Sequence, residues 1–354
     1  MALSGIGKHV KLAVFCMVVF ALPVFAYYAN CSLPLLRLIG GGSFQFGLWG
    51  DMPYAKNHDE PKMPALIGDM NAAGLAFTVY DGDTKDGSSP CDDSAVGEQP
   101  ALLFNQTEAP TVYVPGDNEW TDCHRLSNGG YDALERLSFI RRQLFNTGQS
   151  FGKNKLKLEH QGPLGGPYSE NTRWVYRRVV FVGLNVPGSN NGKVDPARCL
   201  SLANSARTEE QCEADNWEYQ DRNKNNREWL ADSFRLAKES QAPGVMVAIQ
   251  ADPGFDLPET EHIDERTLPE FDGYTGFLEE LEAQTQAFAG QVVLVHGDTH
   301  FFKVDKPLFK QSHLLRNLTR VETFGSPNIH WVKVTVDPLS RNVFSFEPMI
   351  VKGN

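Results

Sequence analysis

The stretch 291–302, Gln-Val-Val-Leu-Val-His-Gly-Asp-Thr-His-Phe-Phe, decides the fold class of this chain. Its residues 292–296 are mostly β-branched or aliphatic, as expected for a strand that is buried on both faces. Gly297 then permits a sharp turn, and Asp298 and His300 follow with one residue between them. Because side chains just past the C-terminal end of such a strand line the ligand crevice of an α/β sheet, both can face one metal ion or phosphate.

The same pattern occurs three more times upstream, where an expected strand ends in a Gly-Asp pair: Gly50-Asp51, Gly82-Asp83 and Gly116-Asp117. At any single position the aspartate can instead be a helix cap or a turn residue. Four such positions on buried strands favour a shared site. Carboxylates that meet in one crevice repel each other unless a cation lies between them. The pattern therefore predicts a bound pair of divalent metal ions.

Expected strands and helices alternate along the rest of the chain. Hydrophobic patterns predict strands at 44–49, 75–80, 111–114, 174–186, 245–249, 321–324, 330–337 and 343–346. They predict helices at 63–73, 100–104, 130–145, 227–240 and 276–289. The segment 155–171 is expected to be a surface excursion and 190–226 an inserted loop. This order predicts an α/β protein of one domain, with a largely parallel sheet covered by helices and a second sheet packed on it.

Composition limits the classes of function. The chain has 354 residues, of which 41% are hydrophobic, enough to bury one large core or two small ones. Its 33 basic and 44 acidic residues give a formal charge of −11, which argues against a basic nucleic-acid-binding surface. An acidic balance fits both an exported protein and a metal protein rich in carboxylates.

The N-terminus has the pattern of a secretory signal peptide. Lys8 and Lys11 precede an apolar run, 12–26, which ends in Val-Phe-Ala. Removal of residues 1–26 would leave the single domain 27–354 in the periplasm or outside the cell, with no membrane contact. The alternative is an uncleaved membrane anchor, but an apolar run of about 15 residues is short for a membrane span.

Removal of that segment leaves five cysteines, and an oxidising compartment permits disulfides between them. Cys199 and Cys212 bracket a polar segment and form the most favourable pair. Cys91 and Cys123 each follow a candidate site loop and can clamp the two loops together. Cys31 is left over. No cysteine pair has the spacing of a zinc–thiolate site.

In order, the motifs resemble those of the calcineurin-like metallophosphoesterase family over about residues 44–337. The residues that carry the resemblance are Asp51, Gly82-Asp83, Gly116-Asp117-Asn118-Glu119, a strand that ends before Pro253, and the Gly-x-Thr-His of 297–300. The resemblance implies a four-layer α-β-β-α sandwich. It also implies two metal ions that share one aspartate, and hydrolysis of phosphomonoesters or phosphodiesters by attack of a metal-bound hydroxide.

Residue by residue, the resemblance implies Asp51 and His300 as ligands of the first metal, Asp83 as the bridge, and Asp298 as a ligand of the second. Most other family histidines are replaced. The departures are Pro53 for the histidine of Asp-x-His, Asp86 for the tyrosine that replaces that histidine in one branch, Asp117 for the metal-binding asparagine, Asn118 for the histidine that acts on the leaving group, and Asp252 or Gln250 in the place of His-His-Pro.

Such an oxygen-rich ligand set suits Mg²⁺, Mn²⁺ or Ca²⁺ better than zinc, and iron and zinc also stay open. Loss of the histidine at Asn118 removes a general acid, whose help is worth about 10²–10⁴-fold in rate. His124 follows on the same loop, where it can restore an imidazole or be a loop histidine bonded to the backbone.

Four further side chains near the expected site have two interpretations or an indirect role. His296 lies inside the strand and is a core histidine or a ligand. Glu119 can hydrogen-bond a ligand from behind. Trp49 and Trp120 are core or lid residues, or they stack on a base or sugar.

Three functions stay open. An exported metal-dependent phosphoesterase acting on a phosphorylated small molecule or a phosphodiester agrees with the four Gly-Asp turns. A non-catalytic binding or structural protein with the same fold would explain the missing histidines. A metal-free carboxylate enzyme such as a glycosidase would use paired aspartates as acid and base. Substrate choice is expected to depend on the loops 155–171 and 190–226.

Overall fold

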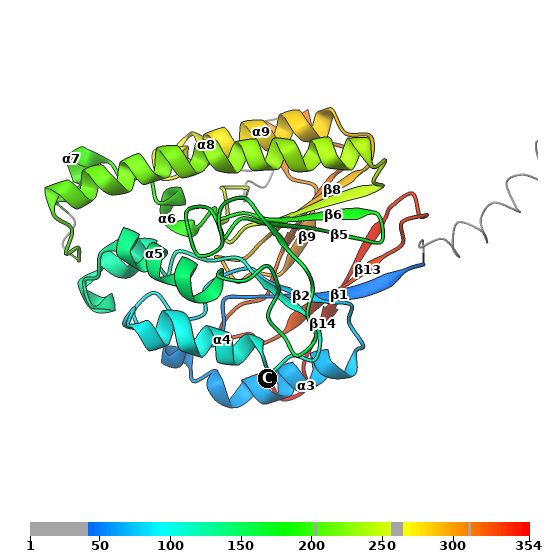
Figure 1. Ribbon diagram of the computed structural model, residues 1–354, viewed down its shortest axis with the longest axis horizontal. Helices are drawn as coiled ribbons and strands as arrows, with labels where there is room; N and C mark the ends of the chain where they lie inside the picture. The colour runs from blue at the N-terminus through cyan, green and yellow to red at the C-terminus, as the bar shows by residue number, and fades with distance from the viewer. Residues whose placement is uncertain (1–41, 202–203, 256–264, 311–312) are drawn as a thin grey trace, which may run out of the picture. The chain divides into compact units, whose positions relative to one another are not determined.

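A computed structural model describes residues 42–201, 204–255, 265–310 and 313–354. Ser43 to Asn354 form one compact unit, shown in Figure 1. The expected signal peptide and Cys31 lie outside the described residues. No helix in the described ranges combines the length and the apolar character that crossing a membrane requires.

Two mixed sheets form the centre of this unit. The smaller sheet has the strand order β14-β13-β1-β2-β3 and the larger has the order β4-β5-β6-β7-β8-β12-β9. The smaller sheet contains β1 (Phe44–Trp49), β2 (Thr78–Tyr80), β3 (Thr111–Tyr113), β13 (Trp331–Val336) and β14 (Phe344–Met349). The larger contains β4 (Glu159–His160), β5 (Thr172–Tyr176), β6 (Val179–Gly183), β7 (Gly244–Ala248), β8 (Gln291–His296), β9 (Lys303–Asp305) and β12 (Leu318–Glu322). A separate ribbon pairs β10 (Leu308–Lys310) with β11 (His313–Leu314).

The helices fall into those that cover the sheets and short ones in the connections. The former are α3 (Met63–Ala72), α4 (Gln99–Phe104), α5 (Ala133–Leu144), α8 (Glu209–Glu239) and α9 (Thr275–Gln286). The latter are α6 (Gly188–Asn191), α7 (Pro196–Cys199), the π-helical η3 (Ser94–Glu98), and the 3-10 turns η1 (Ala55–Asn57), η2 (Glu60–Lys62), η4 (Thr121–His124), η5 (Leu126–Asn128), η6 (Glu265–Thr267) and η7 (Asp272–Tyr274).

Three apolar cores separate four layers. Phe46 and Val112 of the smaller sheet meet Phe181, Met246 and Val293 of the larger in the central core. A second core joins α3 and α5 to the outer face of the smaller sheet, and a third joins α8 and α9 to the outer face of the larger sheet. Figure 1 shows α8 and α9 over one sheet and α3 and α4 under the other. The predicted four-layer α-β-β-α sandwich is confirmed.

The parallel strands place their C-terminal ends at one edge. Strands β1, β2 and β3 are parallel neighbours, and so are β6, β7, β8 and β12. The expectation of a largely parallel sheet holds for these central strands, whereas β13, β14, β4, β5 and β9 pair antiparallel. The loops after β1, β2, β3, β7 and β8 carry most of the predicted site residues.

The expected inserted loop 190–226 is wrong over its second half, because α8 begins at Glu209. A capping box starts this helix: the Thr208 side chain accepts a hydrogen bond from the Gln211 amide, and the Gln211 side chain accepts one from the Thr208 amide. Apolar periodicity did not reveal the helix because polar side chains occupy part of its buried face. Arg222 and Asn226 are fully buried there, and both donate to the Asn185 carbonyl.

Candidate metal centre

Three carboxylates meet at the common edge of the two sheets. Asp83 follows β2, Asp117 follows β3 and Asp298 follows β8, so the group joins the smaller sheet to the larger. One oxygen of each lies within 4.8 Å of an oxygen of the other two. Asp83 and Asp117 are buried. The structure thus brings three of the predicted metal ligands together.

The backbone that presents the site residues is strained. The φ angles of Asp51, Asp83, Asp298 and His300 are 52°, 59°, 75° and 65°, in the left-handed region that non-glycine residues rarely adopt. Each such residue costs on the order of 1–3 kcal/mol and persists only where the surrounding structure holds it in place. The preceding glycines serve close approach, since a β-carbon on Gly116 or Gly297 would overlap the carboxylate of Asp83 or Asp51.

Asp51 and His300 form a second part of the centre beside Asp83. His300 Nε2 lies 3.5 Å from Asp51 Oδ1 and 3.3 Å from the Tyr54 hydroxyl. That hydroxyl donates to Asp83 Oδ2 at 3.2 Å, so Tyr54 links the two parts. Tyr54 was not identified from the sequence, although this tyrosine directly follows Asp51-Met52-Pro53, the stretch that replaces the Asp-x-His motif. Asp51 also accepts a hydrogen bond from the Asp298 amide at 3.2 Å.

Asn118 and Glu119 hold the Asp83 turn in place. The Asn118 amide group donates to Asp83 Oδ2 at 2.6 Å, and its backbone N–H donates to Asp83 Oδ1 at 3.1 Å. Glu119 accepts hydrogen bonds from backbone and hydroxyl groups of the neighbouring turns. It accepts from the Gly116 amide at 2.7 Å and from the Thr84 hydroxyl at 2.9 Å, and so fixes the turns that carry Asp83 and Asp117.

Gln250 and Ser189 complete the surroundings of Asp117. Gln250 Nε2 lies 3.3 Å from Asp298 Oδ1 and 3.5 Å from Asp117 Oδ1. The Ser189 hydroxyl lies 2.8 Å from both Asp117 Oδ2 and Asp122 Oδ1. Ser189 was not found from the sequence because it comes from the connection after β6, which carries no motif.

The electrostatics of the group fit a bound cation. Burial raises the pKa of Asp83 well above its usual value, and the nearby charges of Asp117, Glu119, Asp51 and Asp298 raise it further. Burial and the charges of Asp117 and Asp51 likewise raise the pKa of Asp298. Every neighbouring charge that most affects Asp83 is thus a carboxylate. A divalent ion among three oxygens would remove this repulsion.

Two predicted site residues have other partners. The Asp86 carboxylate accepts from Ser88 Oγ at 2.6 Å and Ser89 Oγ at 2.7 Å. Burial would raise the pKa of Asp86, but these hydrogen bonds outweigh it and lower the pKa to about 2. Asp252 is grouped with His296 and Glu322 instead of with Asp83.

His124 lies on η4, where its Nδ1 is 3.0 Å from the Ser205 hydroxyl. Burial, with the charges of Arg207 and Arg125, lowers the pKa of His124 to about 3. The ring is therefore neutral at neutral pH. Trp49 and Trp120 are buried in the core below the smaller sheet, so neither stacks on an open site.

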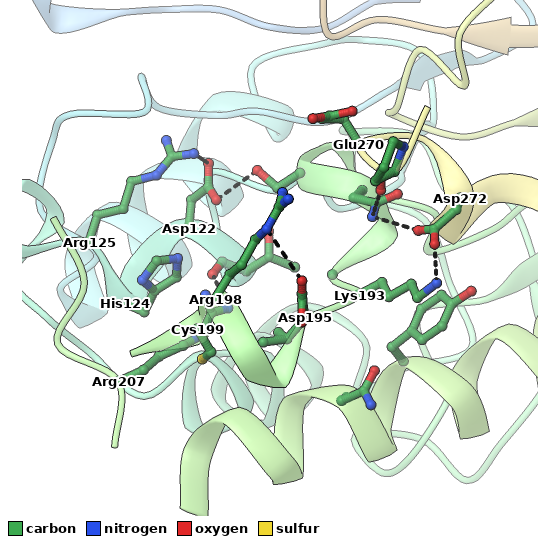
Figure 2. Close-up of a pocket in the computed structure, with 18 of the residues that line it drawn as sticks. Asp122, His124, Arg125, Lys193, Asp195, Arg198, Cys199, Arg207, Glu270 and Asp272 are labelled. Atoms are coloured by element: carbon green, nitrogen blue, oxygen red, sulfur yellow. Dashed lines mark hydrogen bonds and ion pairs between the residues drawn. The ribbon is translucent and has the colours of Figure 1, made fainter. Parts of the chain in front are cut away.

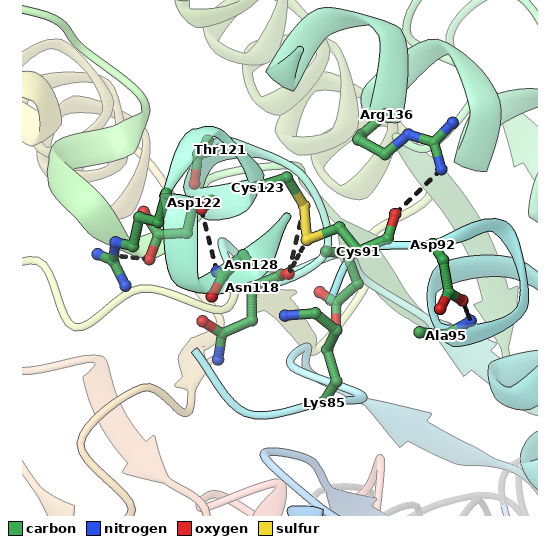
Figure 3. The surroundings of a disulfide bond; sticks show 12 residues. Lys85, Cys91, Asp92, Ala95, Asn118, Thr121, Asp122, Cys123, Asn128 and Arg136 are labelled. Carbon is green, nitrogen blue, oxygen red and sulfur yellow. Dashed lines mark hydrogen bonds and ion pairs between the residues drawn. A yellow bond between two sulfur atoms is a disulfide. The ribbon is translucent and has the colours of Figure 1, made fainter. Parts of the chain in front are cut away.

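A disulfide braces the Asn118 turn. Cys91 and Cys123 are bonded, with their Cα atoms 5.7 Å apart, and the second predicted pair, Cys199 and Cys212, is also bonded. Figure 3 shows both sulfurs of the first pair facing the carbonyl oxygen of Asn118, at 3.5 and 3.6 Å. The predicted clamp between the two loops is therefore confirmed.

A cavity of about 1010 Å³ opens beside the carboxylates. Ser189 lines this cavity and also contacts Asp117. Its walls come from η4, the connection through α6 and α7, α8 and the segment before α9. Figure 2 shows that charges of both signs line it: Arg125, Lys193, Arg198, Arg207, Asp122, Asp195, Glu270 and Asp272. Arg125 pairs with Asp122 at 2.6 Å and Lys193 with Asp272 at 2.5 Å.

Comparison with known proteins supports the fold. No protein-family model and no curated protein matches the chain. Among solved structures, that of PhoD has a TM-score of 0.53 and 12% identity, and the match covers 89% of this chain and 68% of that one. This likeness shows the fold that the resemblance to calcineurin-like metallophosphoesterases implied.

Two other solved structures are more distant. GAP50, described as the anchor in the inner membrane complex of Plasmodium, has a TM-score of 0.43 and 13% identity over 88% of this chain and 90% of that one. The 5'-nucleotidase from Candida albicans has a TM-score of 0.39 and 10% identity over 86% and 50% of the respective chains.

Proposed function

We propose that the chain is an exported, metal-dependent phosphoester hydrolase. The observation that carries this proposal is the close group of Asp83, Asp117 and Asp298, whose oxygens lie within 4.8 Å of one another. These three would hold one divalent cation, and Asp51 and His300 would hold a second, with Asp83 between them. Oxygen ligands favour Mn²⁺, Mg²⁺ or Ca²⁺, while iron or zinc also fits a set with one imidazole.

The division of labour in this proposal follows from the contacts. A bound divalent cation polarises a phosphoryl oxygen and lowers the pKa of a water molecule. Asn118 and Tyr54 keep the Asp83 carboxylate in one orientation, and Gln250 aligns Asp117 with Asp298. The left-handed backbone at Asp83 and Asp298 fixes these side chains before substrate binds, which lowers the reorganisation that the reaction requires.

The cavity beside Ser189 would take the organic part of the substrate. Its mixed charges suit a polar phosphorylated small molecule or a phosphodiester better than an apolar one. His124 would contact this part as a neutral ring and not as an imidazolium acid. Two disulfides agree with an oxidising compartment, and the N-terminal signal-peptide pattern completes the proposal of export.

A second candidate is a metal-binding protein that does not hydrolyse its ligand. It is favoured by the shortage of imidazole groups that could donate a proton to the leaving group. Within the described ranges, His300 is the histidine that contacts the carboxylates around Asp83, and His124 is uncharged at neutral pH. Without a proton donor, only substrates with good leaving groups would react.

Metal analysis by elemental mass spectrometry, run beside assays with p-nitrophenyl phosphate and bis-p-nitrophenyl phosphate, separates the two candidates. We expect Mn²⁺, Mg²⁺, Ca²⁺ or Zn²⁺ to support turnover, and Asp83→Asn to lower it by more than about 100-fold. Asp232→Asn is the matched control, since Asp232 is a carboxylate paired with Arg173 on the far side of the larger sheet. Bound metal without turnover supports the second candidate, and turnover unchanged in Asp83→Asn contradicts the assignment of the centre.

A separate variant tests Asp86, which the sequence predicted as a metal ligand and which accepts hydrogen bonds from Ser88 and Ser89 in the structure. Because serine hydroxyls occupy the Asp86 oxygens, we expect Asp86→Asn to leave the metal content at its wild-type value. Loss of one metal ion in this variant would restore Asp86 as a ligand.

A further inference from the structure

A second group of ligand atoms lies behind the first. His296 and Glu322 are the last residues of β8 and β12, and Asp252 lies in the loop after β7; these three strands are adjacent in the larger sheet. One ligand atom of each lies within 4.8 Å of those of the other two, and all three residues are buried. His296 and Glu322 have no exposed surface at all. Two carboxylates and an imidazole are thus enclosed together.

Two atoms of this group lack a hydrogen-bond partner among the described residues. They are Nε2 of His296 and Oε2 of Glu322. Lys303 Nζ lies 3.8 Å from Oε2, which is beyond hydrogen-bond distance. A buried polar atom without a partner is costly, and one cation between these two atoms would satisfy both.

Each of the three side chains is held by one atom and offers another. His296 Nδ1 lies 3.0 Å from the Gly297 carbonyl, and Glu322 Oε1 accepts from the Phe301 amide at 2.8 Å. Asp252 Oδ1 accepts from the Gly254 amide at 2.9 Å. With Nδ1–H donating, Nε2 carries the lone pair. This is the tautomer in which histidine binds metals, with its second nitrogen held by a carbonyl or carboxylate.

We propose that Asp252, His296 and Glu322 form a further divalent-cation site, separate from the group of Asp83, Asp117 and Asp298. One imidazole and two carboxylates are a ligand set for Zn²⁺, Fe²⁺ or Mn²⁺. The two groups touch through the Asp252 amide, which donates to Asp298 Oδ2 at 3.2 Å. The proposal does not depend on phosphoester hydrolysis, because the site would exist in a binding protein as well.

The site would stabilise the turn that carries Asp298 and His300, two residues of the neighbouring metal centre. Glu322 Oε1 also accepts from the Thr299 hydroxyl, so the side chain that would bind the cation already holds the turn between Asp298 and His300. A cation here would fix Glu322 and, through it, this turn. The expected role is structural support for the neighbouring centre.

The test loads the full chain with Zn²⁺, removes the excess by gel filtration, and counts zinc per chain by elemental mass spectrometry. We expect His296→Gln to bind one zinc fewer than the wild type and Asp83→Asn to keep that zinc. His330→Gln is the matched control, because His330 is half-buried and its Nδ1 contacts only a backbone carbonyl, that of Ile329. Melting curves in EDTA identify any variant that has merely failed to fold, and Glu322→Gln then replaces His296→Gln.

Two results would overturn the proposal. One is an equal zinc count in the folded His296→Gln variant and the wild type. The other is a ¹⁵N NMR spectrum of the zinc-loaded chain in which both His296 nitrogens carry protons, since His296 would then be an imidazolium paired with the two carboxylates. Zinc that raises the melting temperature of the wild type and of His330→Gln, but raises that of His296→Gln less, supports the proposal.

Discussion

Two buried charged regions of this protein are built in opposite ways. In the first, Asp83 meets Asp117 and Asp298, and burial and neighbouring charge both raise the pKa of Asp83. In the second, Glu170 is equally buried, but Arg141 donates to its carboxylate at 2.7 Å and Asn185 donates at 3.0 Å. Burial would raise the pKa of Glu170, yet the charge of Arg141 and the hydrogen bonds from Arg141 and Asn185 together outweigh burial and lower the pKa.

The difference separates a carboxylate that is paired within the fold from a group of carboxylates that could hold a metal ion. At Glu170 the chain supplies its own cation, so the carboxylate supports the packing of α5 against the loop before β5. At Asp83 the surrounding charges are carboxylates, and the backbone pays for left-handed turns at several of them. A cation from solution would relieve the repulsion within the Asp83 group.

Removing the internally paired carboxylate should have the largest effect on stability. Glu170→Ala leaves the guanidinium of Arg141 buried without its anion, and we expect a loss of about 4 kcal/mol in the free energy of unfolding. Glu159→Ala is the control. Glu159 pairs with Arg173 at 2.7 Å but is mostly exposed, so its loss should be at most about 1 kcal/mol. Urea denaturation of both variants measures the difference, and equal losses would contradict the comparison.

The same pair gives a pH dependence. The folded-state pKa of Glu170 is below its ordinary value of 4.5. The ion pair therefore contributes fully at pH values above 4.5, and its contribution is lost as the pH falls through the folded-state pKa. We expect the stability difference between the wild type and Glu170→Gln to be constant from pH 6 to 8 and to shrink below the ordinary value. A difference that grows on acidification would reverse the assignment.

The Cys91–Cys123 disulfide should matter to both stability and the metal centre. Replacing both cysteines by serine releases a loop with a sequence separation of 32, which corresponds to roughly 3.5 kcal/mol in the chain-entropy account. Because the sulfurs contact the Asn118 carbonyl, we also expect weaker metal binding, measured by titration calorimetry.

The second disulfide is the control for this effect. Its sequence separation of 13 corresponds to roughly 3 kcal/mol, but its sulfurs lie between α7 and α8. Removing the Cys199–Cys212 bond should therefore destabilise the chain and leave metal affinity unchanged. Equal effects of both pairs on metal affinity would show that general stability, and not the Asn118 turn, sets the affinity.

The effect of Asp298→Asn on the free energy of unfolding should have opposite signs without and with metal. Without metal, the substitution removes one of three mutually repelling carboxylates, and we expect a gain of about 1 kcal/mol in the free energy of unfolding. With Mn²⁺ present, it removes a ligand and should lower stability relative to the metal-loaded wild type. Melting temperatures in EDTA and in excess Mn²⁺ test both signs. A loss under both conditions would mean that Asp298 supports the fold itself.

The fold was predictable where burial is apolar and hidden where it is polar. The segments that form β1 and β8 are mostly apolar, and their positions were predicted to within a residue. Helix α8 was shortened in the prediction because Arg222 and Asn226 sit where apolar residues were expected. That half of the helix is held by hydrogen bonds, which leave no apolar periodicity in the sequence.

The site followed the same division. The Gly-Asp turns revealed Asp51, Asp83, Asp117 and Asp298, because each needs its glycine for close approach. Tyr54 and Ser189 were missed, since their roles arise from contacts between loops far apart in the chain. Asp252 was predicted as a ligand, but its neighbours His296 and Glu322 are set by the pairing of β7, β8 and β12.

The smallest effect is expected at His124, which lines the cavity. A general acid at this position would be worth about 10²–10⁴-fold in kcat. With a pKa of about 3 and a contact to Ser205, the ring is uncharged at neutral pH. We therefore expect His124→Ala to raise KM through the lost cavity wall and to lower kcat less than about 10-fold. Asn118→Ala is the comparison, because it frees Asp83 and should lower kcat with little change in KM. A large fall in kcat for His124→Ala, with a pH profile that loses its basic limb, would make His124 the missing acid.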